Sequence, residues 1–176
     1  GGGRAGGGAM GGRGARAGGG GAPAPPARAS EGCGKAGRPA RGEVVVDNEY
    51  LLAFPATYDG STPMPVVFGF HGANRTHIDL RNTDAPLRNA FESKYVMAYV
   101  RSVGSNWQGE LAANFARFDK VFDVLSKNHC VDLERVFAVG HSSGAQFVSQ
   151  LICRPDARLR AVAPVAGWPT SGNCRA

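Results

Sequence analysis

The sequence predicts an α/β fold in which helices cover both faces of a mostly parallel sheet. Short, continuous apolar runs, typical of strands that are buried on both faces, recur along residues 43–176. Segments with helical periodicity separate these runs. Such alternation is typical of βαβ units, whose crossovers are right-handed. No internal repeat is visible.

The apolar runs predict strands in chain order. Residues 44–54 are expected to form two short strands around a turn at Asp47–Asn48. The run 65–70 (PVVFGF) ends abruptly at a histidine and a glycine, as a buried strand that leads into a loop would. Further strands are expected in 95–100, 135–139 and 159–165.

Helices are predicted between these strands. The clearest lies within 111–125, where large apolar residues step by four, three, four and three and so share one stripe. The stripe consists of Leu111, Phe115, Phe118, Phe122 and Leu125. Asp84 followed by Pro86 indicates the start of another helix, with Leu87, Ala90 and Phe91 on its apolar face. Residues 146–152 predict a third helix.

Composition divides the chain near residue 42. Residues 1–42 hold 17 of the 26 glycines and contain no Leu, Ile, Val, Phe, Tyr or Trp. Ordering a backbone costs roughly 1–2 kcal/mol per residue, and nothing in this segment buries enough apolar area to offset that cost. We therefore expect a disordered Gly/Ala/Arg/Pro-rich tail and linker in 1–42 and one globular unit in 43–176.

Charge follows the same division. The net charge of the chain is +6, and residues 1–42 supply all of it. The globular part has no positive excess with which to neutralise phosphates, so a basic nucleic-acid-binding domain is disfavoured. Arginines among glycines leave two interpretations of the tail, an RGG-like RNA-binding arm or a low-complexity leader. The tail has no aromatic residue for base stacking, which favours the leader. No run approaches the ~18 apolar residues of a membrane span.

The strongest chemical signal is Gly140–Gly144 (GHSSG), which matches the G-x-S-x-G nucleophile elbow. A predicted strand ends at Gly140 and a predicted helix begins just after Ser142, which is the context that the motif requires. Glycines two places before and after the serine avoid collisions of a Cβ with neighbouring chain. Ser142 is the predicted nucleophile, in a strained conformation, and the Ser143 amide should face a developing oxyanion. His141 should point elsewhere. The alternative is an ordinary glycine-rich turn.

A second motif follows the strand 65–70, where the chain reads HGAN from position 71. This strand-to-helix loop supplies the other oxyanion amide in enzymes that have such an elbow. We expect that amide to belong to Ala73, with Gly72 as the alternative. Losing one such donor typically costs ~10²–10³ in rate. His71 is interpreted as a structural residue that anchors the loop rather than as the catalytic base.

These motifs resemble secreted polyhydroxybutyrate depolymerases and feruloyl-esterase-like α/β-hydrolases of the carbohydrate esterase family one type. The resemblance covers nearly all of residues 32–168. It is carried by GCGK from Gly32, YLLAFPATYD, PMPVVFGFHG, Trp107, NHCVDLERVFAVGHSSGAQF, LICR and AVAPVAG. It implies an α/β-hydrolase fold and an extracellular or periplasmic serine esterase without a cofactor, acting on aryl, acyl or polyester bonds, as in polysaccharide degradation. Ser143 stands where relatives often carry Asn, and the HGAN loop lacks the HGGG of lipases.

The resemblance also implies a catalytic Asp and then a His after later strands. Downstream of Ser142 the chain has a single carboxylate, Asp156, which lies in a predicted surface turn, and no histidine. His77 and His129 are expected to be solvated loop residues. We therefore expect an N-terminal fragment, almost inert, because loss of the base costs on the order of 10⁶ in turnover. Its last strand should expose an edge.

The chain has four cysteines, Cys33, Cys130, Cys153 and Cys174. An even number in a loop-rich chain indicates an oxidising compartment, and without a CxxC or metal-ligand spacing no metal site is expected. Cys130 precedes the strand 135–139 at its lower end. A helix descends about 1.5 Å per residue, so Cys153 should lie ~16 Å below the elbow, beside Cys130. This predicts a Cys130–Cys153 disulfide; Cys33 and Cys174 would pair together or with other partners. Four free thiols are the alternative.

Three functions remain open at this point. The first is a serine carboxylic-ester hydrolase with a small or polymeric ester substrate. The second is a peptidase of the same fold, and the third is an inactive hydrolase fold used for binding. Trp107 and Trp168 are equally compatible with a cleft wall and with the core. The sequence does not identify the ester or the oligomeric state.

Overall fold

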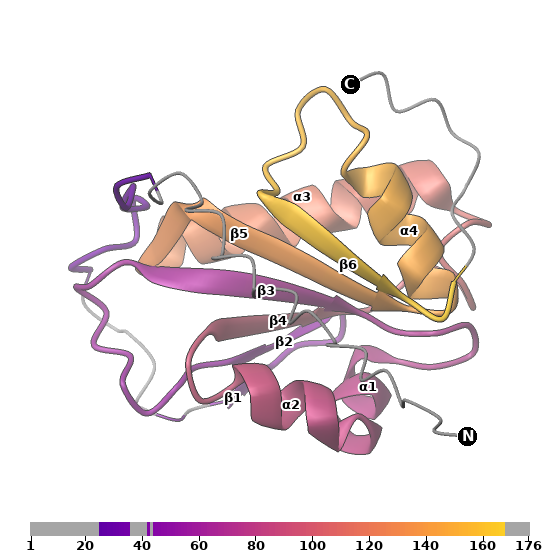
Figure 1. The fold of residues 1–176 in the computed structure, drawn as a ribbon, viewed down its shortest axis with the longest axis horizontal. Coiled ribbons are helices and arrows are strands. Elements are labelled where there is room, and N and C mark those ends of the chain that lie inside the picture. Colours follow the sequence, from indigo (N-terminus) through magenta and orange to yellow (C-terminus); the bar gives the residue numbers. More distant parts are fainter. Residues whose placement is uncertain (1–24, 36–41, 43, 168–176) are drawn as a thin grey trace, which may run out of the picture.

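The computed structural model describes residues 25–35, 42 and 44–167, and their main feature is a six-stranded sheet (Figure 1). The strands are β1 (Val44–Val46), β2 (Tyr50–Ala53), β3 (Met64–Phe70), β4 (Val96–Val100), β5 (Val131–His141) and β6 (Ala161–Val165). Their order across the sheet is β1-β2-β4-β3-β5-β6. The pairs β1–β2 and β2–β4 are antiparallel, and β3–β4, β3–β5 and β5–β6 are parallel. The predicted mostly parallel sheet is confirmed.

Each predicted strand is present, and the largest change of length is in β5. The turn between β1 and β2 closes through a 2.8 Å hydrogen bond that the Asp47 amide donates to the Tyr50 carbonyl. β5 begins at Val131, four residues before the predicted start, and its pairing with β3 shifts register between Met64 and Val66. β6 lies at an edge of the sheet, and Val165 is 48% exposed, as expected for a strand with one open edge.

Helices cover both faces of the sheet (Figure 1). They are α1 (His77–Thr83), α2 (Ala85–Phe91), α3 (Leu111–Asn128) and α4 (Ser143–Leu151). α1 and α2 pack on one face and α3 and α4 on the other, so the core has two clusters. The Asp84 carboxylate caps α2 by accepting from the Leu87 amide, as predicted, although Ala90 on that helix is exposed.

Sequence reasoning missed α1. Its first turn holds a capping box, in which the Thr76 hydroxyl accepts from the Asp79 amide while the Asp79 carboxylate accepts from the Thr76 amide. A Thr-x-x-Asp spacing was therefore the signal that could have found it. The expectation of solvated histidines was also wrong, because His77 at the start of α1 is buried and donates to the Asp47 carbonyl. His129 is half-buried, with its ring 4.8 Å from that of Phe54.

The two faces of β3 carry side chains of different size near the end of the strand. Alternate residues of β3 point to opposite faces, and the large rings of Phe68 and Phe70 lie in the cluster under α3 and α4. Trp107 joins them fully buried, with its ring 5.1 Å from that of Phe70, so it belongs to the core. On the opposite face, a Cβ at Gly69 would lie 3.1 Å from the Tyr99 ring. Trp168 lies outside the described residues.

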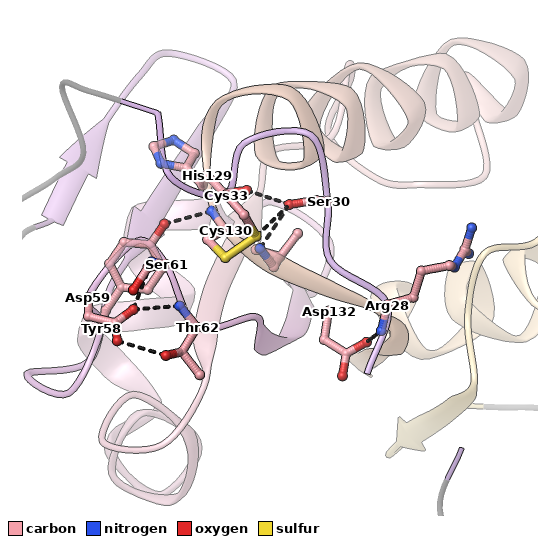
Figure 2. Close-up of a disulfide and its surroundings, with 11 residues drawn as sticks. Arg28, Ser30, Cys33, Tyr58, Asp59, Ser61, Thr62, His129, Cys130 and Asp132 are labelled. Atoms are coloured by element: carbon pink, nitrogen blue, oxygen red, sulfur yellow. Dashed lines mark hydrogen bonds between the residues drawn. A yellow bond between two sulfur atoms is a disulfide. The ribbon is translucent and has the colours of Figure 1, made fainter. Parts of the chain in front are cut away.

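Part of the predicted tail is attached to the sheet (Figure 2). Ala29 forms an antiparallel bridge with Asp132, and the Ser30 hydroxyl donates to the His129 carbonyl at 2.7 Å. A disulfide joins Cys33 to Cys130. Residues 28–35 thus pack with the globular part, while residues 1–24 and 36–41 of the tail and linker predicted for 1–42 lie outside the described residues.

The predicted Cys130–Cys153 disulfide is therefore wrong. The helical rise estimates the height of Cys153 along the sheet, but it says nothing of which neighbour lies beside Cys130. The segment before the globular part occupies that place, and it approaches so closely that a Cβ at Gly32 would lie 2.2 Å from the His129 amide nitrogen. The alternative of four free thiols is wrong too, because no cysteine is free among the described residues.

Candidate active site

Ser142 occupies the bend between β5 and α4. Its φ of 54° and ψ of −115° lie in the left-handed half of backbone space, which costs of order 1–3 kcal/mol for a residue with a side chain. Both sides of the residue are held: its amide donates to the Val165 carbonyl at 2.9 Å, and its carbonyl accepts from the Ala145 amide at 3.0 Å. The surrounding chain therefore maintains the strained bend.

The two glycines of the elbow have no room for a side chain. A Cβ at Gly140 would lie 2.1 Å from the Gly144 carbonyl oxygen, and a Cβ at Gly144 would lie 2.2 Å from the Phe70 carbonyl oxygen. Both collisions are with backbone, which cannot move aside without shifting a strand. Only glycine therefore fits at both positions of the motif, because any Cβ would collide with backbone.

The loop after β3 lies directly beside the elbow. A Cβ on Gly72 would lie 3.6 Å from the Ser142 Cβ and 3.3 Å from the His141 Nδ1. Asn74 has a φ of 57°, and its amide donates to the Ser105 carbonyl at 2.7 Å, which sets the path of the loop. Within the described part of the chain, the structure records no hydrogen bond from the amides of Ala73 or Ser143.

His71 is buried and both of its ring nitrogens are engaged. Nδ1 donates to the Gly72 carbonyl at 2.7 Å, so the 3.1 Å bond from the Ser102 amide is accepted at Nε2. Burial lowers the pKa of His71, which keeps the ring neutral. The predicted structural role is confirmed, because a ring with two occupied nitrogens has no free site for a proton from Ser142.

A third loop, which the sequence did not indicate, joins the two motifs. The Trp107 indole donates to the His71 carbonyl at 2.7 Å, and the Trp107 amide donates to the Ser143 hydroxyl at 3.2 Å. The Gln108 amide group accepts from the Ser143 hydroxyl at 2.7 Å and donates to the Ser143 carbonyl at 3.0 Å. Asn114 of α3 donates to the Trp107 carbonyl. Side-chain hydrogen bonds therefore connect the elbow to the loop after β3.

Two pockets flank Ser142, and both are lined by Ala73. One has a volume of about 340 Å³ and includes His71, Gly72, Ala73, Arg75, Leu80, Thr83, Asp84, His141 and Ser142. The other, of about 460 Å³, includes Ala73, Asn106, Gln108, Ser142, Ser143, Gln146, Ala166 and Gly167. We expected His141 to point elsewhere, but it lines the first pocket; no hydrogen bond between it and Ser142 is recorded. A serine between two pockets can bind the acyl part of an ester in one pocket and the alcohol part in the other.

A larger pocket lies elsewhere among the described residues. It measures about 620 Å³ and is lined by residues from α3, the start of β5 and the segment before β6, including Phe122, Leu133 and Leu159. It is at the opposite end of β5 from Ser142, so its volume alone does not identify the functional site.

The described residues supply neither a catalytic dyad nor a metal site. Asp156 is exposed and paired with Arg154 at 2.7 Å. No group of His, Cys, Asp and Glu that could hold a metal ion occurs among residues 25–35, 42 and 44–167. In the same residues, no helix is long and apolar enough to cross a membrane.

No family model matches the chain, whereas two feruloyl esterases are similar to it in sequence. Feruloyl esterase C of Emericella nidulans is 27% identical over 149 residues, and feruloyl esterase D of Neurospora crassa is 27% identical over 160 residues. Each match covers 81% of this chain and 55% of the relative. The chain therefore spans about half the length of the curated relatives it matches.

Solved structures of similar proteins indicate the same fold. The poly(3-hydroxybutyrate) depolymerase of Bordetella parapertussis superposes with a TM-score of 0.51 and 25% identity, over 65% of this chain and 44% of the depolymerase. The protein FAE has a TM-score of 0.56 at 13% identity, over 74% of this chain and 54% of FAE, and is evidence for the fold alone. By sequence and fold together, the chain has an α/β-hydrolase fold and is similar to feruloyl esterases and to a poly(3-hydroxybutyrate) depolymerase.

Proposed function

We propose that the protein is a serine carboxylic-ester hydrolase with Ser142 as its nucleophile. The observation that carries the proposal is the strained backbone of Ser142 between two glycines that cannot bear a Cβ, beside the loop of Gly72 and Ala73. A hydroxyl on such a bend projects above the sheet into the flanking pockets.

The reaction is a two-step acyl transfer. As the Ser142 Oγ–C bond forms, its proton passes to a general base and the carbonyl π pair moves to the oxygen. The amides of Ser143 and Ala73, with Gly72 as the alternative donor, bind that oxyanion. The base returns the proton to the alcohol oxygen as the ester C–O bond breaks, and water then releases the acid by the same steps. We propose that the base and its carboxylate come from sequence outside residues 1–176, because the chain spans about half of its relatives.

The relatives suggest the substrate class. Feruloyl esterases and a poly(3-hydroxybutyrate) depolymerase are similar to the chain, so we propose an aryl, acyl or polyester ester, such as a feruloyl or acetyl group on a polysaccharide. The Cys33–Cys130 disulfide supports an extracellular or periplasmic location, since reducing compartments keep cysteines as thiols.

A fluorophosphonate probe tests the nucleophile. We expect the full-length protein, which includes the base, to be labelled at one site and Ser142→Ala to lose the label. Ser149→Ala, at a half-buried serine of α4 whose hydroxyl donates to the Ala145 carbonyl, is the matched control that keeps it. Labelling that survives Ser142→Ala would refute the assignment. Comparing hydrolysis of an ester with that of the matching anilide separates an esterase from a peptidase. An unlabelled wild-type protein that hydrolyses neither would favour a binding role for the fold.

A further inference from the structure

Two adjoining pockets extend from Ser142 past the loops that follow β3 and β4. The pocket of about 340 Å³ beside Ser142 shares Arg75 with a pocket of about 560 Å³. That second pocket lies between the turn before β2, the loop after β3 and the loop after β4, and we call it the arginine pocket. Its charged lining residues are Glu49, Arg75, Arg101 and Arg117.

Three guanidinium groups and one carboxylate leave the arginine pocket with an excess of positive charge. The carboxylate of Glu49 is already matched, because it pairs with Arg117 at 3.1 Å and with Lys120. Arg117 also donates to the carbonyls of Arg101 and Ser102, so its donors are engaged within the protein. These contacts leave Arg75 and Arg101 as the two cations available to a ligand.

Neither of these two arginines has an ion-pair partner among the described residues. Arg101 makes only a long contact of 3.4 Å with the Asn48 carbonyl, and no hydrogen bond is recorded for the Arg75 side chain. Two acidic side chains of the surrounding segments are hydrogen-bonded to other groups: Asp79 holds the capping box of α1, and Asp47 accepts from the Glu49 amide. The hydrogen bonds from Thr76, with a smaller part from Arg75, lower the pKa of Asp79.

The backbone beneath both arginines is held by hydrogen bonds. Arg75 follows Asn74, whose amide is bound to the Ser105 carbonyl at 2.7 Å, and the Arg101 amide donates to the Glu49 carbonyl at 2.8 Å. A guanidinium presents its donors as a planar fork that matches a carboxylate, and two forks on fixed loops lose little backbone freedom on binding. The arginine pocket is thus organised to bind an anion, and it adjoins the pocket that Ser142 lines.

We propose that the arginine pocket binds a carboxylate group of the ester substrate while the ester carbonyl lies at Ser142. The inference rests on the proposed esterase function and deepens it: the preferred substrate carries a negative charge on the side of Arg75. A uronic acid unit of a polysaccharide or the free end of a hydroxyacid oligomer has this chemistry. Asp84, in the wall of the Ser142 pocket, would repel a charge placed too close to the serine.

The test compares two esters that differ only in charge. One is the mono-4-nitrophenyl ester of glutaric acid, and the other is the same compound with its free carboxylate capped as a methyl ester. We expect the wild-type protein to favour the charged ester in kcat/KM by about fivefold, the value of one exposed ion pair. Arg75→Gln and Arg101→Gln should each reduce that ratio, and added salt should reduce it in the wild type.

Controls separate this proposal from the proposed function. Arg158→Gln, an exposed arginine at the other end of the sheet, should leave the ratio unchanged. A wild-type ratio of one, or variants that lower both rates equally, would overturn the proposal while leaving Ser142 as the nucleophile. If neither ester is hydrolysed, calorimetry with glutarate decides: binding that weakens in Arg75→Gln supports the pocket, and no binding overturns it. Tighter binding of inorganic phosphate than of glutarate would overturn the choice of a carboxylate.

Discussion

The two ends of β5 solve different problems with different chemistry. Before its first residue, Cys130 is tied to Cys33, and a side-chain hydroxyl and an antiparallel bridge hold residues 28–35 in place. After its last residue, Ser142 is held in a strained conformation by glycines and backbone hydrogen bonds. The first end adds stability through a covalent link and the second stores strain. The contrast shows that Ser142 follows a strand, β5, whose other end is fixed by the Cys33–Cys130 disulfide.

Removing the disulfide should have the largest effect. Cys33→Ser opens a loop with a sequence separation of 97, and links of that length contribute about 4 kcal/mol. We expect Cys33→Ser and Cys130→Ser to lower the free energy of unfolding equally and the double variant to lower it no further, as urea unfolding would measure. An unchanged stability for Cys33→Ser would contradict this pairing. Activity per folded molecule should not change, because the link lies at the other end of β5.

Adding a side chain at a glycine of the elbow should have the next largest effect on stability. In Gly144→Ala the new Cβ meets the Phe70 carbonyl at 2.2 Å, and overpacking of this kind costs about 1–3 kcal/mol. The shift needed to relieve it should also slow fluorophosphonate labelling by about 10²-fold, as for loss of one oxyanion donor. Gly104→Ala is the matched control for stability, since its Cβ would meet only the flexible Glu110 side chain at 3.9 Å. Equal stability of the two variants would argue against a close-packed elbow.

Loss of the Gln108 side-chain amide should have a smaller effect. Gln108→Met keeps the length of the side chain but removes two hydrogen bonds to Ser143, so the Ser143 amide should be less well positioned. We expect kcat to fall about tenfold, equal to ~1.4 kcal/mol, with little change in KM. Gln150→Met, near the end of the helix that begins at Ser143, is the control, because Oε1 of Gln150 is buried without a hydrogen-bond partner among the described residues. A rise in KM at constant kcat would instead indicate substrate contact.

Lowering the pH by one unit should have the smallest effect, and this effect is on stability. Burial lowers the pKa values of His71 and His77 below the ordinary 6.5, so the unfolded state binds more protons than the folded state in acid. Stability should therefore be constant above pH 6.5 and fall below it, by at most about 1.4 kcal/mol per pH unit for each histidine. Thermal unfolding between pH 5 and pH 8 measures this, and His71→Asn should reduce the slope. Stability that rises on acidification would contradict neutral, buried rings.

Local patterns predicted the elements that rest on local physics. The stripe from Leu111 to Leu125 became α3, and the apolar runs became strands, because periodicity reports directly which side is buried. The elbow glycines were predictable for the same reason, since a tight bend forbids a Cβ whatever the rest of the fold does. The error about His141 has the opposite cause: the direction of its side chain depends on the neighbouring loop at Gly72.

The sequence by itself determined the fold class and the strand-to-helix setting of Ser142, because each depends on residues that are close along the chain. Only the tertiary structure decided that Cys33 pairs with Cys130, that Trp107 is a core residue and that Arg75 and Arg101 meet at one pocket. Each of these unites segments far apart in sequence. Their contact depends on how strands are ordered and how loops return to the sheet, which spacing along one segment does not encode.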